Sequence, residues 1–143
     1  MRSAVPLVVG LFVVLGCSSL RPVAINTNDV CETCKRVITQ PKAAAEIMET
    51  SGLARKFRTV SCMARYISQH PSDGGVFVTD YKTGRFLSAR SAVYVKARID
   101  ENTREEAYLA FADVAAAVEF GKANGSSPVD WPAVMKQTSA AAN

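Results

Sequence analysis

The apolar segment at the N-terminus determines how much of the chain is left to form a folded domain. Arg2 is followed by an uncharged, largely apolar run from Ala4 to Leu15. This run is shorter than the roughly 20 residues that a membrane-spanning helix needs, and it has the length of the apolar part of a secretory signal peptide. We therefore predict that residues 1–16 are a signal peptide. The part that folds is then about residues 29–137, which suffices for one compact domain with a modest core.

The end of the apolar run predicts a lipid anchor. The sequence Val14-Leu15-Gly16-Cys17 resembles the lipobox of bacterial lipoproteins, in which the cysteine is acylated and becomes the first residue of the mature chain. A simple signal peptide followed by an incidental cysteine is the alternative. Ser18 after the cysteine favours the outer membrane under the sorting rule of Gram-negative lipoproteins. We expect a protein of the bacterial cell envelope that faces the periplasm.

The segments on either side of the folded part are polar and rich in small residues. We predict that residues 17–28, which contain Pro22, form a lipidated N-terminus and a flexible tether. Residues 138–143 are small and polar, and we predict a disordered tail there.

Apolar patterning within residues 29–137 predicts an α+β fold of two small ββαβ-like lobes packed as one compact domain, with a cleft between them. Gly84 lies in a predicted hairpin turn, at a position that needs a positive φ. The expected strands are 35–40, 43–48, 76–81, 86–87, 93–99 and 106–111, and the expected helices are 60–69 and 113–123.

Composition and missing motifs exclude several classes of function. The net charge of +4 and the isoelectric point near 9.0 come without a dense Lys/Arg run, so we expect no nucleic-acid partner. The single histidine, His70, precedes Pro71, where a solvated or capping role is expected. The sequence has no glycine-rich phosphate loop and no metalloprotease motif. We therefore do not expect an enzyme.

Sulfur carries the remaining chemistry. Cys31 and Cys34 form a Cys-x-x-Cys motif, and Cys62 stands beside Met63 at the start of the predicted helix 60–69. Three thiols permit either one disulfide and a free thiol or a three-sulfur metal site. Thiolate and thioether ligands select Cu(I) or zinc, and a helix N-terminus would lower the pKa of the Cys62 thiol. A disulfide or redox pair at the motif is the alternative, although a thioredoxin-type site is disfavoured because β-branched residues follow Cys34.

Several segments together resemble the NosL family, which comprises accessory lipoproteins of nitrous oxide reductase. The resemblance spans nearly the whole predicted domain. It rests on the order and spacing of the segments Asp29–Cys34, Ala44–Ile47, Val60–Ala64, Val76–Tyr81, Ala92–Val95, Leu109–Asp113 and Asp130-Trp131.

The resemblance implies a membrane-anchored periplasmic Cu(I) chaperone that helps to load a multicopper enzyme, with a fold of two ββαβ-like lobes akin to part of organomercurial lyase. It implies a copper-receiving partner in the periplasm, such as nitrous oxide reductase or its assembly machinery. The candidate metal ligands are Cys31, Cys34, Cys62 and Met63, and Cys17 is the candidate lipidation site. Packing in the core is the alternative role for Met63.

The chain departs from the family pattern at two places. Lys35-Arg36 stands where the family has Gly-Met, and Arg104-Glu105 stands near the second Met-Gly of the family. A guanidinium cannot donate electrons to a metal. One hypothesis is an all-thiolate Cu(I) site whose charge of −2 is partly neutralised by Arg36 and Arg104. The alternatives are a thiol–disulfide protein that uses Cys31 and Cys34, and a structural paralogue that binds no metal.

Overall fold

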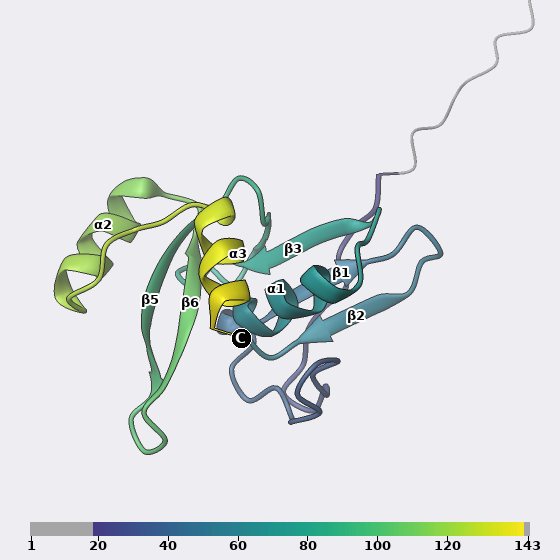
Figure 1. The fold of residues 1–143 in the computed structure, drawn as a ribbon, viewed down its shortest axis with the longest axis horizontal. Coiled ribbons are helices and arrows are strands. Elements are labelled where there is room, and N and C mark those ends of the chain that lie inside the picture. The colour runs from purple at the N-terminus through teal and green to yellow at the C-terminus, as the bar shows by residue number, and fades with distance from the viewer. Residues whose placement is uncertain (1–18, 142–143) are drawn as a thin grey trace, which may run out of the picture.

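The computed structural model describes residues 19–141. It contains a four-stranded antiparallel sheet in the order β2-β1-β3-β4 and a two-stranded antiparallel ribbon of β5 and β6 (Figure 1). The predicted signal peptide and Cys17 lie outside the described residues. The elements in chain order are a 3-10 helix (Pro41–Ala43), β1 (Ala45–Met48), β2 (Ala54–Phe57), α1 (Val60–Gln69), β3 (Gly75–Thr79), β4 (Phe86–Ser88), β5 (Val93–Asp100), β6 (Glu105–Phe111), α2 (Val114–Ala123) and α3 (Trp131–Ala140).

The helix predicted over residues 60–69 is confirmed as α1, and its local sequence explains both ends. The hydroxyl of Thr59 accepts a hydrogen bond from the backbone amide of Cys62, which caps the first turn. The helix ends before Pro71, which cannot continue it. Apolar residues recur at helical spacing on one side, so that Val60 and Met63 are buried against the four-stranded sheet.

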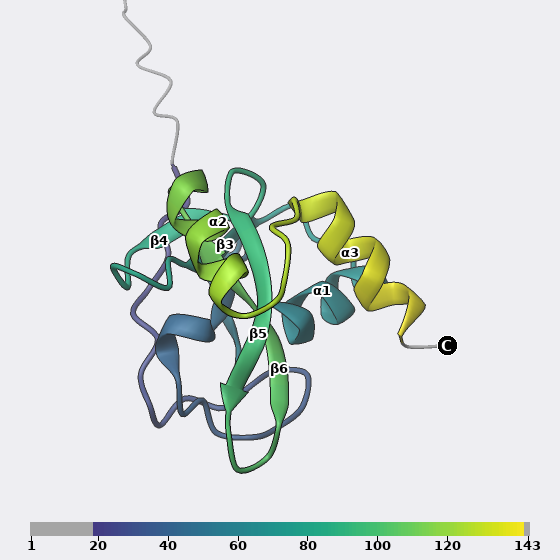
Figure 2. The same ribbon diagram turned by 90° about the vertical axis from the view of Figure 1, so that its left-hand side faces the viewer.

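The β5–β6 ribbon separates α2 from the other two helices (Figures 1 and 2). On the side of α1 and α3, Tyr94 and Trp131 pack with their ring centroids 5.9 Å apart in the main core. On the side of α2, a smaller core contains Phe111 and Leu109. The ribbon therefore lies between the two cores and contributes residues to both.

The α+β class and the lobed architecture are confirmed, but the second lobe departs from the ββαβ pattern. Its fourth strand is reduced to one bridge between Val129 and Tyr94, and the chain then continues into α3. The expected cleft lies between α1, the ribbon and α3. It has a volume of about 270 Å³ and is lined by residues that include Ser61, Arg65 and Tyr108.

Two further expectations are wrong. Residues 35–40 do not form a strand, since Val37 makes only a single bridge to Val30. The predicted tail begins too early, because residues 138–140 form the last turn of α3 and Thr138 is buried. The signal for α3 is Asp130, whose carboxylate accepts a hydrogen bond from the amide of Ala133 as a helix cap.

The described part of the predicted tether is attached to the domain. The backbone amide of Val23 donates to the buried carboxylate of Glu46 on β1 at 2.9 Å. Lys56 on β2 donates to the carbonyl of Ala24 at 2.8 Å. The expectation of a flexible tether is therefore wrong for residues 23 and 24, because the sheet supplies hydrogen-bond partners to this backbone.

Asp80 joins the two sheets. It forms a parallel bridge with Ala110 of β6, and its carboxylate accepts hydrogen bonds from the amide of Ala112 and from the hydroxyl of Thr83. Burial alone would raise the pKa of Asp80, but these hydrogen bonds and those from the loop amides outweigh it and lower the pKa.

We expect Asp80→Asn to lower the free energy of unfolding at pH 7 by about 1–3 kcal/mol, because the amide group cannot accept all of these buried hydrogen bonds. Because the folded-state pKa is lowered, this stabilisation is present above the ordinary pKa of aspartate, about 3.9, and is lost as the pH falls through the folded-state pKa. The unfolding free energy of the variant should accordingly vary less with pH in this range. Urea denaturation measures both effects, with the exposed Glu101→Gln as the control. Equal stability of the two variants would contradict the assignment.

Candidate metal centre

A short turn that precedes β1 carries the first two cysteines. The amide of Cys31 donates to the carbonyl of Arg36 at 2.9 Å, and the amide of Lys35 donates to the carbonyl of Cys31 at 3.0 Å. Lys35 adopts a φ of +58°, in the left-handed region. These hydrogen bonds close the turn and hold Cys31 and Cys34 on one side of it.

The turn is attached to β2 and to α1. The amide of Glu32 donates to the carbonyl of Lys56 at 2.8 Å, and the hydroxyl of Thr33 donates to the carbonyl of Cys62 at 2.9 Å. Asp29 accepts a hydrogen bond from the amide of Asn26 and pairs with Lys56 at 2.7 Å. Asp29 therefore caps the backbone of the loop that precedes the cysteine turn.

The three thiol sulfurs converge. The Sγ atoms of Cys31, Cys34 and Cys62 all lie within 4.8 Å of one another, and all three cysteines are free. Cys31 and Cys62 are buried, whereas Cys34 is partly exposed. A thiolate binds zinc at about 2.3 Å, so three sulfurs around an ion of that size stand about 4 Å apart. The group can thus close around one soft metal ion with a small contraction.

The pKa values of Cys31 and Cys62 are shifted in opposite directions. A hydrogen bond from the Cys62 thiol is the main cause that lowers the pKa of Cys31, and backbone amides of Arg58 and Cys34 add to it against the opposing effect of burial. The same hydrogen bond, together with burial, raises the pKa of Cys62. The helix N-terminus was expected to lower the pKa of Cys62, but the neighbouring sulfur of Cys31 and burial act in the opposite direction.

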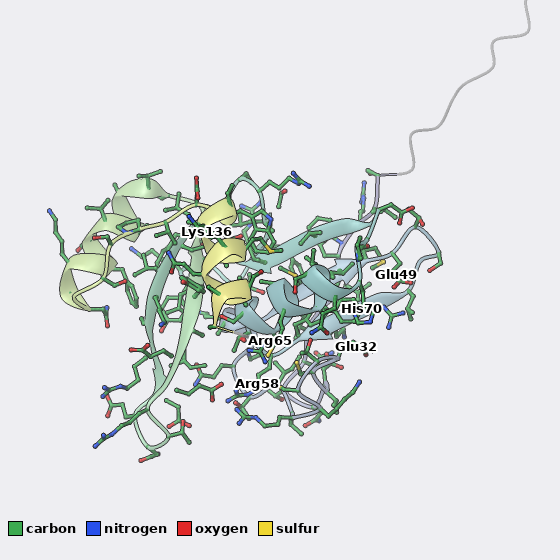
Figure 3. The ribbon with its side chains drawn as sticks, viewed as in Figure 1. Glu32, Glu49, Arg58, Arg65, His70 and Lys136 are labelled. Carbon is green, nitrogen blue, oxygen red and sulfur yellow. The ribbon has the colours of Figure 1, made fainter. Side chains whose placement is uncertain are left out.

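A chain of charged groups lies beside the sulfurs. Arg58 forms two hydrogen bonds with the carboxylate of Glu105 at the start of β6, one of them at 2.6 Å, and Arg36 contacts the same carboxylate at 3.0 Å. The pKa of Arg58 is raised mainly by its hydrogen bond with Glu105. Figure 3 shows Arg58 and Glu32 on the same side of α1, next to the N-terminal loop. These contacts bring the ribbon of the second lobe to the sulfur group.

Comparison with protein families decides the relationship. A family model described as NosL matches residues 22–138, which is most of the chain. The chain belongs to the NosL family. The crystal structure of the copper chaperone NosL from Shewanella denitrificans is similar to it, with a TM-score of 0.64 and 16% sequence identity, over 78% of this chain and 93% of that chain. At this identity the likeness shows a shared fold. No curated protein matches the sequence significantly.

In this NosL chain the structure brings three of the four predicted metal ligands together, namely the cysteines. Met63 lies on α1 and is fully buried in the main core, where it packs with apolar residues. His70 ends α1 and stacks on Tyr66, in agreement with a capping role.

Of the two predicted counter-charges, Arg36 forms an ion pair with Glu105 beside the sulfurs. Arg104 is exposed and forms no ion pair with a carboxylate of residues 19–141. Sequence reasoning missed Arg58 and Glu105. The sequence did hold one signal that Arg58 lies near the cysteines. Arg58 directly precedes the capping Thr59, so its backbone amide lies at the start of the helix that carries Cys62.

We expect the reduced protein at neutral pH to contain one thiolate, assigned to Cys31. Ultraviolet absorbance measured as a function of pH reports thiolate formation, and Cys31→Ser should remove the low-pH step. Cys62→Ala should shift this step to higher pH, because it deletes the hydrogen bond that is the main cause of the lowered pKa. Ser61→Ala, in the same helical turn, is the matched control. A low-pH step that survives in Cys31→Ser would overturn the assignment.

Proposed function

We propose that this protein binds Cu(I) through Cys31, Cys34 and Cys62 and delivers it to a partner protein. The observation that carries the proposal is the convergence of three free sulfurs within 4.8 Å in a chain of the NosL family. The fold shared with a copper chaperone supports it. The role is binding and delivery, with no catalytic step.

The donor set favours a soft, monovalent ion. Thiolates select Cu(I) over hard cations such as Mg²⁺ or Ca²⁺. Zinc in structural sites takes four ligands, so three sulfurs alone would leave its coordination incomplete.

The surroundings suit a charged cargo complex. Three thiolates around Cu(I) carry a net charge of −2, and a buried charge is costly unless opposite charges compensate it. Arg58 is the cation placed to compensate this charge. Charged Cys34 and Cys62 would raise its pKa, and its side chain is 12% exposed. Glu105 fixes its guanidinium from the other lobe.

Delivery requires an accessible ligand. Cys31 and Cys62 are buried, whereas Cys34 is partly exposed. An acceptor sulfur can therefore reach the ion on the side of Cys34 and replace the protein ligands one at a time. This arrangement suits transfer rather than permanent storage.

The proposal includes the site of action. We infer that Cys17 is acylated and anchors the protein to the outer membrane, facing the periplasm, because Gly16-Cys17 ends the apolar N-terminal run. None of the helices within residues 19–141 is long and apolar enough to cross a membrane. The proposed recipient is a periplasmic copper protein such as nitrous oxide reductase or its assembly machinery.

We expect the reduced mature chain carrying Cys17→Ser to bind one Cu(I) tightly in an anaerobic titration against a chromophoric chelator. Cys31→Ser, Cys34→Ser and Cys62→Ser should each weaken binding by at least about a hundredfold, since the loss of a metal's outer-shell partner alone costs 10–100-fold. Ser61→Ala should bind like the parent.

Equal affinity of the parent and the cysteine variants would contradict the proposal. A reversible Cys31–Cys34 disulfide in a chain that retains no copper would instead favour the thiol–disulfide alternative. Circular dichroism of each variant separates loss of a ligand from loss of the fold.

A further inference from the structure

The partly exposed Cys34 defines the mouth of the sulfur group. The other two ligands, Cys31 and Cys62, are buried. If the protein delivers Cu(I) as proposed above, the acceptor has to approach on the side of Cys34. The residues that surround this mouth therefore determine which acceptors can dock.

Three exposed cations lie at this mouth, and we call them the cationic rim: Lys35, Arg36 and Arg104. The side chains of Lys35 and Arg36, which directly follow Cys34, are 70% and 60% exposed. Arg104 belongs to the turn between β5 and β6. Its neighbour Glu105 contacts Arg36 at 3.0 Å, so this turn is held next to the cysteine turn.

Two rim residues adopt backbone conformations that favour glycine. Lys35 has a φ of +58° and Arg104 has a φ of +53°, and they are the only non-glycine residues with positive φ among residues 19–141. At its other left-handed positions the chain uses Gly52, Gly84 and Gly125. Glycine would satisfy both backbones without steric cost. The chain thus carries long cationic side chains at two positions of the mouth where the backbone favours glycine.

The rim has positive charge to spare. Lys35 has one distant partner, Glu32, at 3.7 Å, and Glu32 also pairs with Arg55 at 3.2 Å. Arg36 shares its partner with Arg58. Arg104 has no ion pair with a carboxylate of the described residues. The complex of Cu(I) with three thiolates would carry a charge of −2 and repel an anionic acceptor. Cations at the mouth would reduce this repulsion and let such an acceptor approach.

We propose that the cationic rim is the docking surface for an acidic face of the copper acceptor, which it steers to Cys34. This inference rests on the proposed function and specifies the kind of partner. Complementary charge accelerates association and is weakened by salt. The rim therefore acts on the rate of copper transfer rather than on the affinity for copper.

The test measures anaerobic transfer of Cu(I) from the loaded mature chain with Cys17→Ser to two small acceptors. Bicinchoninate is an anionic acceptor, and neocuproine is an uncharged one. The test variant is Lys35→Gly with Arg104→Gly. The control is Arg85→Gln with Arg90→Gln, which removes the same charge from exposed positions elsewhere on the first lobe.

We expect the rim variant to transfer Cu(I) to bicinchoninate at least about threefold more slowly at low salt, with the difference vanishing at high salt. Transfer to neocuproine should be unchanged, and the control should behave like the parent toward both acceptors. The rim variant should be at least as stable as the parent, because glycine fits both left-handed positions.

The possible failures are distinct. Unchanged transfer to bicinchoninate, or equal slowing in the control or toward neocuproine, overturns the docking inference while leaving copper binding intact. A chain that binds no Cu(I) in the titration overturns the proposed function, and this inference with it. Slower transfer confined to the anionic acceptor and the rim variant supports the inference.

Discussion

The packing of the cysteine turn against the first turn of α1 is the interaction on which the candidate site depends. Cys31 and Cys34 are separated from Cys62 by two strands of the first sheet, so only tertiary contacts can bring them together. The amide of Glu32 and the hydroxyl of Thr33 make the two hydrogen bonds that hold the turn on β2 and α1. The thiol of Cys62 then donates to Cys31 and gives the group one stabilised negative charge.

The charged chain beside the sulfurs couples the two lobes to the site. Glu105 comes from the ribbon of the second lobe, whereas Arg36 and Arg58 come from the first. At both places where the resemblance implies a thioether this chain has an arginine, and the structure connects one of them, Arg36, through Glu105 to Arg58.

Local sequence was sufficient for much of the fold. Apolar patterning predicted α1 with its observed bounds, and Gly84 predicted the hairpin between β3 and β4, where it has a φ of +75°. Local rules failed where long-range contacts decide. Residues 35–40 look like a strand but pair only at Val37, and α3 continues through the polar residues 138–140 because it packs on α1.

The ligand types could be predicted from the sequence, but their electrostatics could not. The convergence of three sulfurs followed from the resemblance and the count of thiols. The acidity of Cys31 and Cys62 depends on contacts between residues far apart in sequence, and a helix-end argument applied to Cys62 alone leaves out the sulfur of Cys31 and the burial that raise its pKa. Arg58 was missed for the same reason, since its partner Glu105 lies in the other lobe.

X-ray absorption spectroscopy of the copper-loaded mature chain with Cys17→Ser tests the central claim most directly. The account predicts Cu(I) bound by three sulfur atoms at about 2.3 Å, the distance typical of a metal–thiolate bond. Replacement of Cys62 by serine should leave two sulfurs. A first shell made of nitrogen or oxygen, or a sulfur count that Cys62→Ser does not change, would contradict the account.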